Sequence, residues 1–151
     1  MMDKFETMCE TYKHKQNVSK CISVILYDLI IRSIYHDDSK LKNPEIDIFT
    51  EYTSKLTNST YGSDEYNQFL KEMKVALDSH YANNSHHPEY YNNGIKDMTL
   101  VDLIEMICDW KAATMRHNDG DIYKSIEFNQ KRFGYSDELK QIFINTIDSY
   151  F

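Results

Sequence analysis

Helix-breaking residues are scarce in this chain of 151 residues, which has four glycines and two prolines. Glycine and proline are the residues least compatible with a helix interior, so their scarcity favours helices joined by short connections. No segment suggests a strand. The length suits one domain with a buried core, and we expect residues 1–151 to form a single all-α domain.

Cysteine is also scarce, and no hydrophobic run is long. The three cysteines, Cys9, Cys21 and Cys108, have no CxxC spacing, which argues against a disulfide framework or a zinc ribbon. The first residues lack a signal-peptide pattern, and the most apolar run, 21–35, is shorter than the ~20 residues of a membrane span. We therefore expect no membrane association, a cytoplasmic location (the host cytoplasm if the chain is phage-encoded) and a buried central helix at 21–35.

Positively charged residues are also few. The chain has 17 Lys and Arg against 24 Asp and Glu, which gives a formal net charge of −7. Proteins that grip a nucleic-acid backbone do so with clustered lysines and arginines. We therefore expect no binding to that backbone. A small nucleotide held through a metal ion remains compatible with the charge.

Apolar residues recur at helical spacing along most of the chain. The pattern predicts about six helices, within residues 3–36, 44–56, 63–80, 99–117, 122–133 and 136–147. A polar patch at 13–19 lies inside the first of them. Residues 82–98 have no period and form the longest expected loop, and long loops in compact domains are often functional.

Capping residues mark several helix ends. Thr99, with Asp102 three residues later, resembles a capping box. The other expected caps are Asn43 followed by Pro44 in the first helical position, Ser63, Ser136 and, at a C-terminal end, Gly134.

Metal-competent side chains gather directly after the apolar run, in the segment His36-Asp37-Asp38-Ser39-Lys40. Divalent transition metals prefer imidazole nitrogens and carboxylate oxygens as ligands. More distant positions can supply further ligands of the same kinds. They are His80, the pair His86-His87, and Asp109.

Each of these candidates also has a purely structural explanation. His36 and Asp37 alone would suit a solvated helix end, and His80 alone would suit a core position. The adjacent His86 and His87 would suit a polar loop. The metal hypothesis therefore depends on the combination of candidates.

Residues around the candidates bear on the same question. Asp109 and Glu105 form a like-charge pair one helical turn apart, which destabilises a helix unless a cation lies near. Asp38 and Glu45 could orient imidazoles, although turn and helix-start roles explain them equally well. Tyr81 and Trp110 suit the core or the wall of a pocket.

The order of the candidates resembles the HD phosphohydrolase superfamily, in which a His is followed by His-Asp, His, a His pair and Asp. Here these parts are His14, His36-Asp37, His80, His86-His87 and Asp109. A closer resemblance is to a family of uncharacterised phage and bacterial proteins with HD-like motifs. It is carried by HDDSK (36–40), Pro44-Glu45, HYANNSHHPEYY (80–91) and EMICDW (105–110), and it spans roughly residues 14 to 115.

The resemblance implies an HD-domain-like helical bundle around a site for one or two divalent transition metals, drawn from Mn, Fe, Ni, Co and Zn. One ion would be held by His36, Asp37, Asp109 and His14. Asp37 would bridge to a second ion, held by His80 and by His86, His87 or both. Paired ions would activate a water between them, with Asp37 and the phosphate contact Lys40 as the catalytic side chains.

The expected function is a metal-dependent phosphohydrolase or phosphodiesterase that acts on a small phosphorylated metabolite, with a nucleotide as the first candidate. One alternative is a di-iron oxygenase, because some members of the superfamily use the same ligand order to activate oxygen. Another is a metal-stabilised module that binds a nucleotide or a protein without turnover. A homo-oligomer is compatible with the sequence.

His14 is the weak point of the ligand set. It precedes His36 by 22 residues, and one straight helix between them would separate them by ~33 Å. A shared ion would require the chain to turn back, and no Gly or Pro lies between them. The most favourable place for a turn is the poorly helical stretch 23–28.

Overall fold

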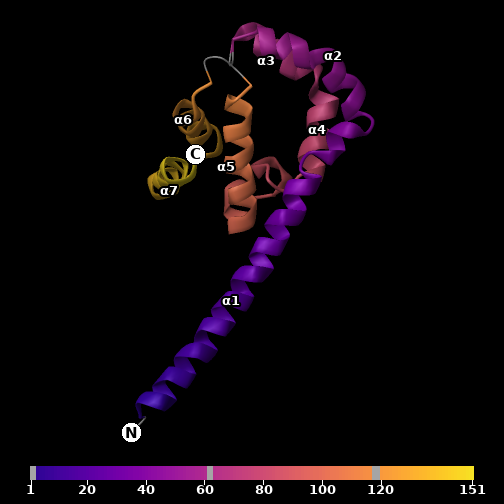
Figure 1. The fold of residues 1–151 in the computed structure, drawn as a ribbon. Helices are drawn as coiled ribbons and strands as arrows, with labels where there is room; N and C mark the ends of the chain where they lie inside the picture. The colour runs from indigo at the N-terminus through magenta and orange to yellow at the C-terminus, as the bar shows by residue number, and fades with distance from the viewer. Residues whose placement is uncertain (1–2, 61–62, 117–119) are drawn as a thin grey trace. The chain divides into compact units, whose positions relative to one another are not determined.

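The computed structural model describes residues 3–60, 63–116 and 120–151. All regular structure in these residues is helical, which confirms the predicted all-α class (Figure 1). The elements are α1 (Lys4–Tyr35), η1 (Asp38–Leu41), α2 (Glu45–Asn58), α3 (Asp64–Glu72), α4 (Lys74–Asn83), η2 (Pro88–Tyr90), η3 (Gly94–Asp97), α5 (Leu100–Thr114), α6 (Ile122–Phe133) and α7 (Asp137–Tyr150). The chain divides into two compact units, residues 1–35 and 36–151. None of the described helices is long and apolar enough to cross a membrane.

The first unit consists of α1, which is unbroken from Lys4 to Tyr35. The polar patch at 13–19 does not interrupt it, because lysine and glutamine are good helix formers. The turn at 23–28 that a ligand role for His14 required is therefore absent. The prediction of burial at 21–35 was also wrong for this unit, since a lone helix has no core and no side chain of α1 is buried.

In the second unit, α6 packs against both α5 and α7 around an apolar core. The ring of Trp110 is stacked on Phe133 with centroids 6.3 Å apart and meets Phe143 edge-on at 5.9 Å. The core cluster consists of Met106, Ile107, Trp110, Ile122, Ile126, Tyr135, Phe143 and Ile147. It fixes the position of α5, which carries two carboxylates of the predicted site.

A second group of helices in the same unit has α2 packed against α3, α4 and η1. The single helix predicted at 63–80 is two helices, α3 and α4, separated at Met73, whose side chain is fully buried. This split raises the number of α-helices in the described residues to seven. Pro44, not Asn43, is the N-cap of α2, so that helix begins one residue later than predicted.

The other caps are confirmed. Thr99 Oγ1 accepts a hydrogen bond from the Asp102 amide at 3.2 Å, and Asp102 Oδ2 accepts one from the Thr99 amide at 2.8 Å, which completes the capping box of α5. Ser63 and Ser136 cap α3 and α7, and Gly134 ends α6 with a left-handed φ of 66°. The helix end predicted at His117 lies outside the described residues, and α5 ends at Thr114.

The segment between α4 and α5 is more ordered than the predicted loop, because it contains η2 and η3. Arg132 of α6 holds it from outside, since its guanidinium pairs with Glu89 of η2 and donates to the Tyr81 hydroxyl at 3.4 Å. His86 and His87 therefore lie on a stretch that is anchored at both ends and tied to α6.

Candidate metal centre

Asp37 gives the segment after α1 its shape. Its backbone is left-handed, with φ 60° and ψ 16°, a conformation that few residues other than glycine adopt and that aspartate tolerates. Consecutive residues on an α-helix point about 100° apart. The left-handed residue ends that pattern, and His36 Nε2 lies 3.6 Å from Asp37 Oδ2.

The first candidate group combines His36, Asp37 and Asp109. His36 Nε2 lies 3.5 Å from Asp109 Oδ1, on α5. One ligand atom from each of the three residues lies within 4.8 Å of the others. This is the first ligand set predicted from the sequence, without His14.

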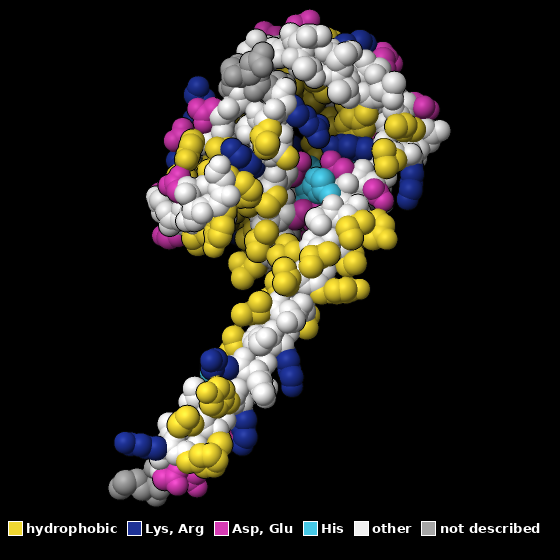
Figure 2. Space-filling model, viewed as in Figure 1, with side chains coloured by type: hydrophobic (Ala, Val, Ile, Leu, Met, Phe, Trp, Pro, Cys, Tyr) yellow, Lys and Arg dark blue, Asp and Glu magenta, His cyan; other side chains and the backbone are white. Residues whose placement is uncertain are grey.

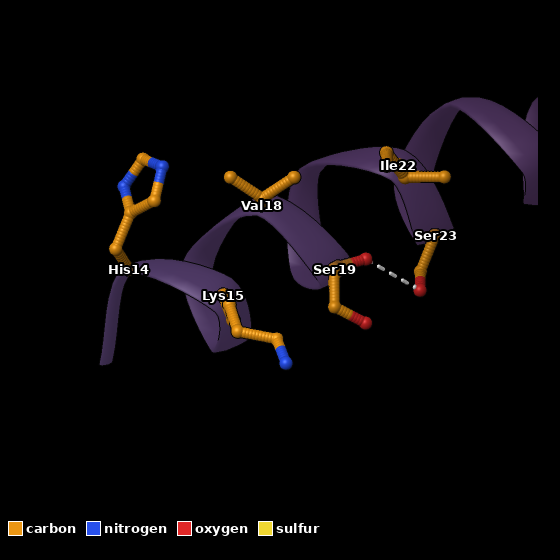
Figure 3. Close-up of a pocket in the computed structure, with 6 residues that line it drawn as sticks. All are labelled: His14, Lys15, Val18, Ser19, Ile22 and Ser23. Carbon is orange, nitrogen blue, oxygen red and sulfur yellow. Dashed lines mark hydrogen bonds between the residues drawn. The ribbon is translucent and has the colours of Figure 1, made fainter. Parts of the chain in front are cut away.

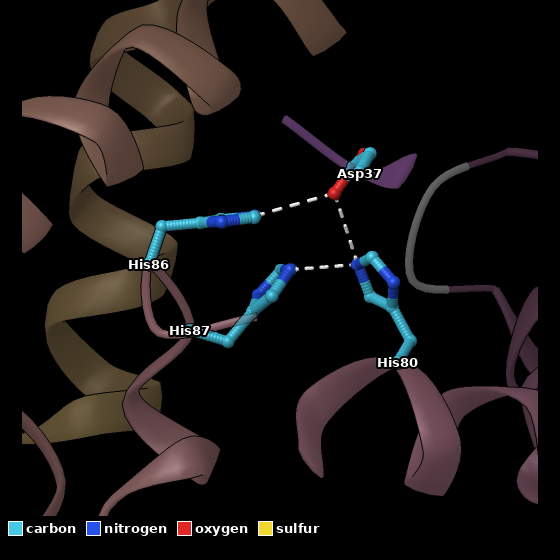
Figure 4. A group of neighbouring side chains, drawn as sticks. All are labelled: Asp37, His80, His86 and His87. Carbon is cyan, nitrogen blue, oxygen red and sulfur yellow. Dashed lines mark hydrogen bonds and ion pairs between the residues drawn. The ribbon is translucent and has the colours of Figure 1, made fainter. Parts of the chain in front are cut away.

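The second candidate group combines Asp37, His80, His86 and His87 (Figure 4). Asp37 Oδ1 lies 3.3 Å from His80 Nε2 and 3.5 Å from His86 Nε2, and the Nε2 atoms of His80 and His87 are 2.9 Å apart. Four potential ligand atoms again fall within 4.8 Å of one another. Asp37 belongs to both groups, which gives it the position of a bridging carboxylate.

Glu45 fixes the orientation of His80. Its side chain is almost completely buried and accepts hydrogen bonds from Ser79 Oγ to Oε1 and from Ser39 Oγ to Oε2, both at 2.8 Å. Glu45 Oε2 also lies 3.0 Å from His80 Nδ1. A carboxylate only accepts, so Nδ1 carries the proton, and in a neutral imidazole Nε2 then presents its lone pair to the group.

Glu105 has the same effect on two other histidines. Its Oε1 accepts a hydrogen bond from His36 Nδ1 at 2.8 Å and lies 3.3 Å from His86 Nδ1. Protons on these Nδ1 atoms leave the Nε2 atoms turned toward Asp37. Three histidines thus have one nitrogen beside a carboxylate and the other directed at the group around Asp37.

Two buried polar atoms at the centre, Asp37 Oδ1 and His86 Nε2, have no hydrogen-bond partner among the described residues. Unsatisfied buried polar atoms are uncommon in proteins. Both atoms belong to the second group, 3.5 Å apart, and both are good metal ligands. A divalent cation would satisfy them together, so the residues present fit a metal ion.

Charge around His36 favours a cation. Its hydrogen bonds with Asp109 and Glu105 raise the pKa of His36 to about 10, against the effect of burial. Burial alone would raise the pKa of Asp109, but the His36 hydrogen bond and the imidazoles of His86 and His87 hold it below its usual value. The Asp109 carboxylate thus stays ionised.

The other side of the centre favours neutral imidazoles. Burial lowers the pKa of His80, and burial together with the neighbouring His86 and His80 lowers the pKa of His87 to about 3. Neutral imidazole is the form that binds metal. The site therefore combines ionised carboxylates at Asp37 and Asp109 with uncharged imidazoles at His80 and His87.

Lys40 is beside Asp37. Its Nζ lies 2.6 Å from Asp37 Oδ2 and 5.3 Å from the centre of the Phe49 ring. Burial opposes the ionisation of Asp37, but the Lys40 charge and hydrogen bond keep the pKa of this carboxyl below its usual value. Contact of Lys40 with a substrate phosphate stays a prediction.

The remaining predicted residues differ in how close they lie to the centre. The Tyr81 ring lies 5.0 Å from the His87 ring, at the edge of the centre, whereas Trp110 lies in the apolar core and Asp38 belongs to neither candidate group. His14 is on α1, and from it the unbroken helix rises ~32 Å to Tyr35, the residue before His36. The same chain therefore does not bring His14 to His36.

Three supporting residues were not predicted from the sequence. Ser39 and Ser79 bond to Glu45, and Asn84 Nδ2 donates to Ser39 Oγ at 2.8 Å and to the His80 carbonyl at 2.7 Å. Adjacency was the only available signal, since Ser39 lies inside the His36–Lys40 segment and Ser79 precedes His80. The centre is visible from outside, because histidine side chains show at the surface between acidic groups (Figure 2).

Comparison with known proteins gives a family without an assigned activity. A family model described as "Family of unknown function (DUF5662)" matches residues 3–149. No curated protein and no solved structure matches the chain.

Proposed function

Because the chain belongs to the family of unknown function DUF5662, we propose its function from the candidate centre itself. We infer that the protein is a metal-dependent hydrolase of phosphate esters or anhydrides, acting on a small phosphorylated metabolite, with nucleotides as the first class to test.

The two buried atoms without a hydrogen-bond partner among the described residues, Asp37 Oδ1 and His86 Nε2, carry the proposal. Leaving such atoms unsatisfied costs about 1–3 kcal/mol each. A folded chain keeps them without partners where a bound group supplies the missing interaction, and the donor set around them is one that transition metals prefer.

The sharing of Asp37 between two groups favours paired ions over one. Two divalent ions bridged by a carboxylate would supply an activated water and would stabilise charge on phosphoryl oxygens. The order of the ligands along the chain, which resembles HD phosphohydrolases, supports the same chemistry.

The chain's own residues would prepare the centre and bind the substrate. Glu45 and Glu105 hold the imidazoles of His80, His36 and His86 with Nε2 directed inward. The Lys40 ammonium, 2.6 Å from Asp37 Oδ2, would offer a positive charge to a phosphate oxygen beside the centre. The half-exposed ring of Tyr81 beside His87 would offer a nucleobase a stacking surface.

Metal content and turnover test the proposal together. The full chain is purified, loaded in turn with Mn, Co, Ni, Fe, Zn or Mg, and assayed against a nucleotide panel and a generic phosphodiester, with bound metal measured by mass spectrometry. We expect hydrolysis and up to two ions per chain. A metal-free protein that hydrolyses none of these compounds would contradict the proposal, and substrate-dependent oxygen consumption with iron alone would assign the oxygenase instead.

Two substitutions locate the ions. Asp37→Asn, which removes a charge common to both groups, should reduce the bound metal to near zero and abolish turnover. Asp109→Asn should lose one ion and keep the other, because the second group does not contain Asp109. Asp38→Asn is the matched control, since this neighbour belongs to neither group. Full metal content in Asp37→Asn would show that the centre lies elsewhere.

A further inference from the structure

The apolar side chains of α1 need a partner surface. Taken by itself the helix buries none of its side chains, and hydrophobic groups follow it along its length (Figure 2). On one face, its large exposed apolar residues are Val18, Ile22 and Ile25. A helix with such a face is stable in water only when the face is covered.

The spacing along one face of α1 is symmetrical about Ile25. Counted outward from Ile25 in either direction, the successive spacings are four, three and four positions. Such spacings keep residues on one side of a helix. In order, they are His14, Val18, Cys21, Ile25, Leu29 and Arg32, and the next position in the series, His36, directly follows the last residue of α1. Figure 3 shows His14, Val18 and Ile22 pointing to the same side of α1.

A symmetrical stripe matches a second copy of itself in the antiparallel direction. With Ile25 against Ile25, Cys21 of each chain faces Leu29 of the other, and Val18 faces the aliphatic stem of Arg32. The facing helical segments from 14 to 35 are ~32 Å long. We propose that α1 pairs with α1 of a second copy, antiparallel and centred on Ile25.

Charge favours this direction over a parallel pair. A parallel pair would place Lys15 against Lys15, which is repulsive. The antiparallel pair brings the basic stretch with Lys13 and Lys15 toward the acidic Asp38 of the other copy. It also opposes the two helix dipoles.

The same register places His14 of one chain opposite the C-terminal end of α1 in the other, where the chain continues into His36. Packed helices lie about 8–10 Å apart, which lets two facing imidazoles reach a common ion. Resting on the proposed function, this step gives the group His36, Asp37 and Asp109 a fourth ligand, His14, from the second copy. The length of the unbroken helix, which keeps His14 away from His36 of the same chain, would then bring His14 close to the centre of the other chain.

Cysteine cross-linking tests the pair and its register without reference to metal. In a chain with Cys9→Ser and Cys108→Ser, adding Leu29→Cys should give an oxidised dimer through Cys21 and position 29. The matched control, with Cys21 alone, should give little. Cross-linking of the control would indicate a parallel pair, and a monomer by light scattering would show that the face is covered within one chain. Either result would overturn the proposal.

Mixed dimers test the contribution of His14. His14→Ala chains should keep one ion each and Asp37→Ala chains none. A heterodimer isolated with two affinity tags should bind two ions, because the intact His14 of the Asp37→Ala chain completes the centre of its partner. One ion per heterodimer would show that His14 does not act in trans. A wild-type chain that dimerises but binds no metal would instead refute the proposed function and leave the helix pair standing.

Discussion

At the scale of single residues, the carboxylates behind the histidines decide which nitrogen is available to a ligand. Glu45 is 1% exposed and has three partners within hydrogen-bond distance, Ser39, Ser79 and His80. Burying a carboxylate is costly unless its oxygens are satisfied. The arrangement around Glu45 is therefore a stable means of holding His80 in one tautomer.

Glu45→Gln should weaken metal binding while the chain stays folded. The amide keeps the shape but no longer fixes the proton on His80 Nδ1, and loss of such a supporting group commonly lowers metal affinity by roughly 10–100-fold. Competition with a coloured chelator measures the affinity, with Asp47→Asn, an exposed position on the same helix, as control. Unchanged affinity in Glu45→Gln would mean that His80 is not a ligand.

The buried phenol of Tyr135 leads us to expect a lower free energy of unfolding at alkaline pH. Its buried hydroxyl donates to the Ile126 carbonyl at 2.6 Å, and burial raises the pKa of the phenol above its ordinary value. The unfolded pKa is about 10, so the contribution of the neutral phenol is complete below that pH and is lost as pH rises through the folded value.

Urea unfolding between pH 8 and 11 measures this effect. Tyr135→Phe should cost about 0.5–1.5 kcal/mol at pH 8 for the lost hydrogen bond and should show a smaller decline above pH 10. The control is Tyr150→Phe, since Tyr150 is 79% exposed. Identical alkaline declines in the wild type and Tyr135→Phe would contradict the assignment.

At the scale of elements, the start of α5 bears on the site, because the helix carries both Glu105 and Asp109. Thr99→Ala removes one half of the capping box and should lower the free energy of unfolding by about 1 kcal/mol. Thr53→Ala is the control, since the exposed Thr53 hydroxyl donates to the Phe49 carbonyl within its own helix. Equal stability changes in the two variants would show that the cap is not needed.

Caps were predictable because each depends on residues three positions apart. Thr99 with Asp102, Ser63, Ser136 and Gly134 all lie where the sequence indicated. The split at Met73 was not predictable, since it depends on how α3 and α4 pack over a fully buried side chain. Burial of α1 was wrongly expected from its composition, which shows an apolar face but not what covers it.

In the candidate centre too, some features could be predicted from the sequence and others depend on tertiary packing. The order of histidines and aspartates along the chain indicated two groups, and the structure brings together all of their members except His14. The hydrogen bonds of Ser79 to Glu45 and of Asn84 to Ser39 join segments that are far apart in sequence, so only tertiary packing could show them.

At the scale of the whole molecule, the ligands come from four segments, around residues 37, 80, 87 and 109. An ion that binds only the folded chain stabilises it by about 2.7 kcal/mol at a hundred times its dissociation constant. For a chain of this size that corresponds to roughly 5–11 °C in Tm. Calorimetry with and without Mn²⁺, and after EDTA, should show this rise and its reversal, whereas Asp37→Asn should show neither. An equal rise in both proteins would indicate binding elsewhere.

The left-handed backbone of Asp37 also has an evolutionary consequence. Left-handed backbone lowers the stability of the folded chain by roughly 1–2 kcal/mol at a non-glycine residue. A glycine at position 37 would avoid this cost and also the cost of burying a carboxylate. Selection for thermostability and selection for metal binding would then favour different residues at position 37. A random library screened only for heat resistance should therefore lose the centre first at this position.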